Sequence, residues 1–184
     1  MMIMIERGYS FGGGSEREIQ RDMKEKLCYI ALDFDEEMET ASKSSKLEKS
    51  YKLPDGQVVV LGNERFRCTE PFFKPSLLGI NSKSLQELIN DSVLKLEYEI
   101  RNLNFTNIVL SGGNTLFPGF VDRLGKEMVS VVHPSLRVKV VAPPERHYSC
   151  WIGGSIMGSL TNTQWISKGE YDEYGCDIVN MKFF

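Results

Sequence analysis

A pair of adjacent glycines between a short apolar run and a helix constrains the fold of this chain more than any other feature. The apolar residues 108–110 predict a strand, Gly112 and Gly113 follow it, and a helix is expected just beyond Pro118, a residue that suits a first helical turn. Glycines in such a turn let backbone N–H groups approach a ligand, and the helix start adds partial positive charge. On these residues alone, a turn required by packing and a ligand-binding turn fit equally well.

Size and composition favour a globular protein and exclude several classes. The chain has 184 residues, enough for one medium domain or two small ones, with 41% hydrophobic and 26% charged residues. The net charge of −3 argues against a nucleic-acid-binding protein. No uninterrupted apolar run approaches the roughly 18 residues of a membrane span, and the apolar start is too short for a signal peptide. We therefore expect no nucleic-acid or membrane partner and no secretion.

The cysteines give no sign of a metal site. The four are Cys28, Cys68, Cys150 and Cys176, and no two have the spacing of a CxxC zinc ligand pair. We expect reduced, mostly buried thiols rather than disulfides or metal ligands.

Helical periodicity and capping boxes predict several helices. Capping boxes occur at residues 15–18, 84–87 and 167–170. The first opens a helix with an apolar face made of Ile19, Met23, Leu27 and Ile30. A second stripe, on nearly the opposite face, contains Arg21, Lys24, Glu25 and Cys28. Further helices are expected at residues 34–41, followed by an exposed polar segment at 42–46, at 85–100, and from Ser149 through Leu160. The helix after Pro118 should bury Phe120, Val121, Leu124 and Met128.

Strand signals lie between these helices. Residues 51–60 predict a hairpin around a Pro54-Asp55-Gly56 turn, residues 68–81 are irregular, and strands are expected at 107–110 and 137–141. Strands interleaved with helices predict an α/β fold. Chain order suggests three pieces, residues 1–80, 81–148 and 149–184.

Three blocks of sequence carry a resemblance to a known family. They are SGGNTLFPG at residues 111–119, APPERHYS at 142–149 and WIGGS at 151–155. In this order they closely resemble the carboxy-terminal half of actin, and the resemblance runs from ERGYSF at residues 6–11 nearly to the last residue. It implies an actin-like fold of the sugar kinase, Hsp70 and actin superfamily, carboxy-terminal half only. The three pieces would then match the fourth subdomain, most of the third, and the returning part of the first.

The resemblance also implies contact with ATP or ADP, bound with Mg in the intact family. It assigns nucleotide contact to Arg21, Lys24, Glu25, Gly112, Gly113, Asn114, Leu116, Phe117 and His147. Glu25 can accept hydrogen bonds from hydroxyl groups, Lys24 can contact base or ribose, and Arg21 can lie against the base. Without the resemblance, the same helix stripe would be a solvated face with ion pairs.

Three of these positions depart from the family. Phe117 has no hydroxyl where the family usually has Tyr, and Asn114 replaces a Thr. His147 replaces a Lys, so any charge that it supplies depends on pH. No metal ligand is identified in this chain.

Subunit contacts are the second implication of the resemblance. Glu6 and Arg7 resemble a lateral filament contact. The positions that form longitudinal filament contacts in the family correspond here to Pro54, Asp55, Gly56, His133 and Pro134. The loop of Leu77, Leu78, Gly79 and Ile80 resembles the plug between filament strands, and burial beneath the hairpin is its alternative. The expected partners are actin subunits and actin-binding proteins, and the expected location is the cytoplasmic cytoskeleton.

Catalysis is not expected from this chain alone. Phosphoryl transfer to water needs a metal, phosphate-cradling groups and an oriented water, which in the family come from the amino-terminal half. We therefore assign no catalytic residue, and the leading hypothesis is an actin-type, nucleotide-binding filament subunit that is truncated. The alternatives are a working ATPase of the same superfamily, a non-polymerising fragment that binds or caps other actin subunits, and a truncated product without a stable fold.

Overall fold

The computed structural model describes residues 2–9, 14–160 and 164–183. The chain forms two compact units, and the boundary between them falls between His147 and Tyr148 in the sequence. The predicted division of the first unit near residue 80 stays a prediction.

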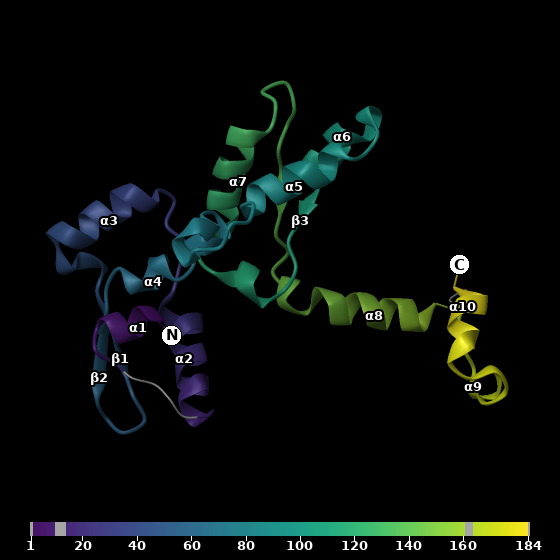
Figure 1. Ribbon diagram of the computed structural model, residues 1–184, viewed down its shortest axis with the longest axis horizontal. Helices are drawn as coiled ribbons and strands as arrows, with labels where there is room; N and C mark the ends of the chain where they lie inside the picture. Colours follow the sequence, from purple (N-terminus) through teal and green to yellow (C-terminus); the bar gives the residue numbers. More distant parts are fainter. Residues whose placement is uncertain (1, 10–13, 161–163, 184) are drawn as a thin grey trace. The chain divides into compact units, whose positions relative to one another are not determined.

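In the first unit, two helices pack against a hairpin (Figure 1). They are α1 (Met2–Glu6) and α2 (Gly14–Leu27), and the antiparallel hairpin joins β1 (Lys49–Lys52) to β2 (Val58–Leu61). Met23 of α2 is buried against Val59 and Leu61 of β2, which confirms the predicted hairpin. Ile19 and Leu27 pack beside Met23 as predicted, but Ile30 lies beyond the end of α2 and packs in the other core of the unit. Helix α2 begins at Gly14, one residue before the predicted capping box at residues 15–18, and the Ser15 side chain of that box lies outside the described residues.

Short elements connect the hairpin to the rest of the unit. The predicted helix at 34–41 is α3 (Phe34–Lys43), which Asp33 caps by accepting hydrogen bonds from the N–H groups of residues 35 and 36. Residues 42–46 are exposed, as expected. The other short helices here are η1 (Ser45–Leu47), α4 (Glu64–Arg67), η2 (Glu70–Phe72) and η3 (Pro75–Leu78).

The expected continuous helix over residues 85–100 is wrong. Helix α5 (Leu85–Leu94) begins at the predicted box, where the Ser84 N–H donates to the Glu87 carboxylate at 2.7 Å. It then stops, and α6 (Tyr98–Phe105) starts. The Arg101 side chain donates to the carbonyls of Leu94 (2.9 Å) and residue 96 (3.0 Å). These bonds satisfy carbonyls that the end of α5 leaves without helical partners.

A small βαβ unit follows. Strands β3 (Ile108–Val109) and β4 (Val140–Val141) pair in parallel, with η4 (Gly113–Leu116) and α7 (Phe120–Val131) between them. The short helix η5 (Arg146–Tyr148) lies at the boundary of the two units. Both strands are shorter than predicted. Pro118 lies before α7 rather than in its first turn, because the helix begins at Phe120.

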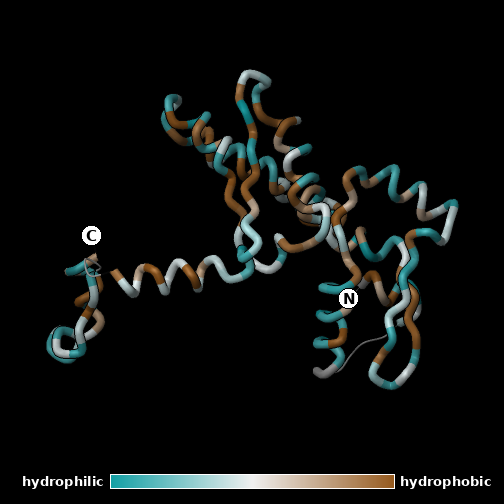
Figure 2. The backbone as a smooth tube through the Cα atoms, turned by 180° about the vertical axis from the view of Figure 1, so that it is seen from behind, coloured by the Kyte–Doolittle hydropathy of each residue, from teal (hydrophilic) through white to brown (hydrophobic). Residues whose placement is uncertain are grey.

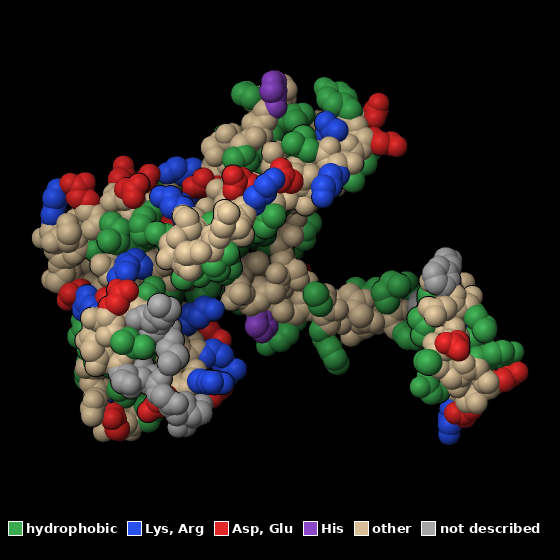
Figure 3. Space-filling view, in the orientation of Figure 1, with side chains coloured by type: hydrophobic (Ala, Val, Ile, Leu, Met, Phe, Trp, Pro, Cys, Tyr) green, Lys and Arg blue, Asp and Glu red, His purple; other side chains and the backbone are tan. Residues whose placement is uncertain are grey.

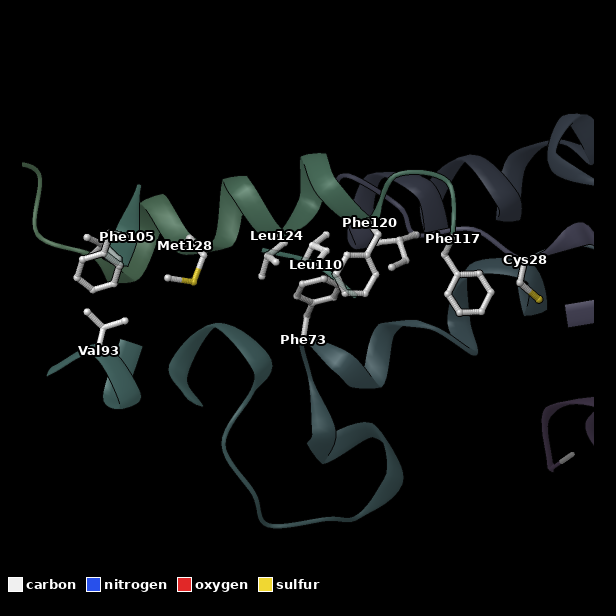
Figure 4. Packing of buried hydrophobic residues seen from close by; sticks show 11 residues of the cluster. Cys28, Phe73, Val93, Phe105, Leu110, Phe117, Phe120, Leu124 and Met128 are labelled. Atoms are coloured by element: carbon white, nitrogen blue, oxygen red, sulfur yellow. The ribbon is translucent and has the colours of Figure 1, made fainter. Parts of the chain in front are cut away.

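The core of this unit runs along α7 (Figure 4). Phe120, Leu124 and Met128 are buried as predicted, while Val121 is only half-buried. Figure 4 shows the buried row extending from Val93 and Phe105 at one end to Phe117 and Cys28 at the other. The core therefore reaches the Gly-Gly turn and the end of α2.

A buried ion pair joins α7 to the preceding segment. Arg123 binds both carboxylate oxygens of Glu70, at 2.8 and 3.1 Å, and donates to the Ala31 carbonyl at 2.9 Å. Its guanidinium also lies over the Phe73 ring, 4.8 Å from the centroid. Because every buried charge here has a partner, this link holds the two parts of the core together.

The second unit is helical. It contains α8 (Ser149–Ser159), α9 (Lys168–Tyr174), η6 (Gly175–Asp177) and α10 (Ile178–Lys182). The helix expected from Ser149 is confirmed, and it ends at Ser159, one residue before the predicted Leu160. The capping box at 167–170 is confirmed: the Ser167 N–H donates to Glu170 at 2.8 Å, and the Glu170 N–H donates to the Ser167 hydroxyl at 3.3 Å. In Figure 2, α8 alternates between hydrophobic and pale segments.

All four cysteines are free thiols, but the expectation that most are buried is wrong. Cys28 is buried, whereas Cys68, Cys150 and Cys176 are exposed.

Candidate functional site

The Gly-Gly turn has the backbone shape that its glycines predict. Gly112 has a φ of +94°, in the region that favours glycine, and its N–H donates to the Arg146 carbonyl at 2.8 Å. The Arg146 side chain in turn donates to the Thr115 carbonyl (3.2 Å) and the Pro143 carbonyl (3.1 Å). Arg146 therefore holds the turn in place. The sequence did not predict this role, because nothing in the local pattern separates it from other surface arginines.

Helix α2 is fixed against this turn. The N–H of Ile30, just after α2, donates to the Pro118 carbonyl at 2.8 Å. The backbones approach so closely that a Cβ on Gly119 would lie 2.3 Å from the Ile30 oxygen. From α2 itself, Lys24 Nζ donates to Asn114 at 3.3 Å. These contacts set the distance between the helix stripe and the turn.

Between them lies a hollow of about 340 Å³. Its lining consists of Arg21, Lys24, Glu25, Gly113, Asn114, Leu116, Phe117 and His147. We call it the α2–turn hollow. The structure thus brings together eight of the nine residues assigned to nucleotide contact from the sequence. The ninth, Gly112, does not line the hollow and shapes the turn through its backbone.

The lining combines an apolar floor with an exposed charged rim. Phe117 is 7% exposed, and Lys24 Nζ lies 5.3 Å from its ring centroid. Arg21 pairs with Glu18 at 2.7 Å and more distantly with Glu25 at 3.8 Å. Figure 3 shows Lys and Arg side chains close to Asp and Glu side chains on the surface of this unit.

This arrangement fits a flat aromatic ring joined to a group that carries hydroxyls. An aromatic face with apolar neighbours suits the base, the carboxylate accepts from hydroxyls, and the cations donate. The volume lies within the range of about 300–1,000 Å³ typical of ligand pockets. Among the described residues, no group of three or more His, Cys, Asp or Glu side chains lies where it could hold a metal ion.

The predicted contact residues lie outside the hollow. The turn at Pro54, Asp55 and Gly56 is exposed, as are His133 and Pro134. Leu77, Leu78 and Ile80 are 52%, 59% and 51% exposed, and Gly79 between them is exposed too. Burial of this loop beneath the hairpin, the alternative considered from the sequence, is therefore wrong.

The predicted lateral pair has partners within the chain. Glu6 accepts from Arg67 at 3.0 Å, and Arg7 binds the buried carboxylate of Glu64 at 2.6 Å. These pairs tie α1 to α4, a structural role that the sequence did not predict.

Two further observations concern the whole chain. Of the helices in the described ranges, none is both long enough and apolar enough to cross a membrane. A family model described as Actin matches residues 4–184, which include the α2–turn hollow and every predicted contact residue. The chain therefore belongs to the actin family.

Proposed function

We propose that this chain is a nucleotide-binding subunit of the actin-type cytoskeleton and that the α2–turn hollow holds the adenine side of ATP or ADP. Family membership carries the general actin-like fold and cytoskeletal role. The observation that supports nucleotide contact is that one hollow contains eight of the nine residues that the resemblance assigns to it. The proposed location is the cytoplasmic cytoskeleton, with actin subunits and actin-binding proteins as partners.

The residues of the hollow have different roles in binding. Leu116 and Phe117 present apolar surface to the base, and Lys24 lies above the same ring. Glu25 accepts hydrogen bonds from ribose hydroxyls, and Arg21 lies against the base. ATP with its magnesium supplies the reacting phosphates, whereas these residues bind and orient the nucleoside.

We propose that this 184-residue chain does not hydrolyse ATP by itself. Its assigned residues contact base and ribose, and none supplies the phosphate cradle or the oriented water that hydrolysis needs. Magnesium-dependent phosphate release that follows the protein through purification, and that disappears in Glu25→Ala, would contradict this.

Calorimetric titration tests the binding site. With contacts on the adenine side only, we expect a Kd of about 1 mM or weaker. Lys24→Ala and Gly113→Val should weaken it further, the latter because a Cβ added at Gly113 would lie 3.2 Å from the His147 ring. Lys26→Ala, on the same helix but outside the hollow, is the control. Sub-micromolar binding, or equal effects of Lys24→Ala and Lys26→Ala, would argue against the proposed site.

A second candidate function is a non-polymerising chain that binds or caps other actin subunits. The exposed apolar side chains of Leu77, Leu78 and Ile80 favour it, because a contact with another subunit would bury them. We expect no filaments from the pure chain and slower elongation of intact actin when the chain is added. Leu78→Asp should remove the slowing, and Leu103→Asp, at an exposed leucine of α6, should not. Regular filaments of the pure chain would exclude this candidate.

A further inference from the structure

Cys28 and Cys68 lie side by side although the sequence separates them widely. Both side chains line the same hollow of the first unit. Two hydrogen bonds hold the adjoining segments together: the Tyr29 N–H donates to the Arg65 carbonyl at 3.1 Å, and the Thr69 hydroxyl donates to the Tyr29 carbonyl at 2.6 Å. The fold itself therefore brings the two cysteines together.

The two thiols differ in exposure and acidity. Cys28 is 8% exposed, whereas Cys68 is exposed. The hydrogen bond from Cys28 and the nearby charge of Lys24 lower the pKa of Cys68. The same hydrogen bond and burial raise the pKa of Cys28. Since the thiolate is the nucleophile, the accessible Cys68 should react first, with Cys28 placed to react second.

Both cysteines line a second hollow of the first unit, with a volume of about 370 Å³. Its lining consists of Ile3, Met4, Arg17, Gln20, Arg21, Met23, Lys24, Cys28, Leu61, Glu64 and Cys68. We call it the thiol hollow.

The charges of the thiol hollow favour an anionic reactant. Three of its side chains are cationic: Arg21, which is paired with Glu18 at 2.7 Å, and Arg17 and Lys24. Its one carboxylate, Glu64, is paired with Arg7 at 2.6 Å. A hollow dominated by one sign of charge raises the local concentration of small ions of the opposite sign.

We propose that Cys28 and Cys68 form a redox pair that small anionic disulfides oxidise. The Cys68 thiolate attacks one sulfur of the reagent, forming a mixed disulfide and releasing the other half as a thiolate. Cys28 then loses its proton to solvent and attacks the Cys68 sulfur, releasing the second half. Both protein thiols are oxidised to one disulfide, and the reagent is reduced to two thiols. This modification goes beyond nucleotide binding and does not depend on it.

The test treats the reduced full-length chain with oxidised glutathione, which is anionic, and locates disulfides by peptide mass spectrometry. The expected product is a Cys28–Cys68 disulfide, lighter than the reduced chain by two hydrogen atoms. In Cys28→Ser the reaction should stop at glutathione attached to Cys68. In Cys68→Ser the buried Cys28 should stay reduced. Cys176→Ser, in the second unit, is the matched control and should form the disulfide at the wild-type rate.

A second arm tests the charge of the hollow. Arg17→Gln should slow the reaction with oxidised glutathione about threefold or more and leave the reaction with cystamine, a cationic disulfide, no slower. Circular dichroism of each variant confirms that it is folded, and guanidinium should abolish the preference for Cys68. Faster reaction at Cys150 or Cys176 than at Cys68, or a preference for Cys68 that survives unfolding, would overturn the proposal.

Discussion

At the scale of single residues, glycine backbones set the geometry of the candidate site. Gly119 lies at a φ of +82° against the Ile30 carbonyl, and Gly112 lies at +94° in the turn above the hollow. The Gly-Gly turn could be predicted from the sequence, because the conformational freedom of glycine depends on the residue itself and not on distant contacts. The sequence did not identify the contact of Gly119 with Ile30, because that contact depends on how distant segments pack.

Gly119→Ala should destabilise the first unit by about 1–3 kcal/mol, since a Cβ would both strain the positive φ and collide with the Ile30 carbonyl. Denaturant unfolding measures the change. Gly125→Ala is the control, because this glycine lies in α7 and the added Cβ would have no atom within 4 Å apart from its chain neighbours and the backbone of its own helix. It should leave stability unchanged or raise it by about 1 kcal/mol. Equal effects of the two substitutions would contradict the close approach.

At the scale of elements, local signals located helix starts better than helix ends. The boxes at Ser84 and Ser167 are confirmed because their hydrogen bonds lie within four residues. The break between α5 and α6 was missed because apolar periodicity continues across it, while Arg101 satisfies the carbonyls at the end of α5. Both strands of the βαβ unit are shorter than their apolar runs, because pairing rather than propensity determines where a strand ends.

The α9–α10 contact should weaken in acid. Hydrogen bonds from Lys182 and from the Ser167 N–H and hydroxyl lower the pKa of Glu170 to about 2, from an ordinary value of 4.5. A carboxylate with a lowered pKa stabilises the folded state above its ordinary pKa, and this contribution is lost as the pH falls from about 4.5 towards 2. NMR titration of the Glu170 carboxyl carbon measures the shift. Lys182→Met should move the midpoint up towards 4.5, and an unchanged midpoint would contradict the assigned cause.

At the scale of the whole molecule, the candidate site joins segments that no local pattern connects. Lys24 and Asn114 are in contact, yet they belong to α2 and to a turn far along the chain. Helical periodicity and charge, taken without the family resemblance, predicted that the stripe of Arg21, Lys24 and Glu25 is a solvent-exposed helix face. The family resemblance instead predicted that this stripe contacts a nucleotide. A resemblance to a known fold indicates which distant segments lie together, and helical periodicity does not.

The apolar surface of α8 predicts association. This helix has no buried residue, and Trp151, Ile156 and Met157 are 77%, 56% and 54% exposed. We expect the isolated chain to bind a dye specific for apolar surface and to self-associate. Ile156→Lys should reduce both, whereas Val129→Lys, at an exposed position of α7, should not. A clean monomer without dye binding would contradict this expectation.

The most direct test of nucleotide contact is an NMR titration of the ¹⁵N-labelled full-length chain with ATP. We expect the largest amide shift changes at residues 21–25, at 112–117 and at His147, because these residues surround the α2–turn hollow. Lys24→Ala should reduce them, whereas Lys26→Ala should not. Shift changes centred on another surface, or none at ATP concentrations well above about 1 mM, would contradict the account.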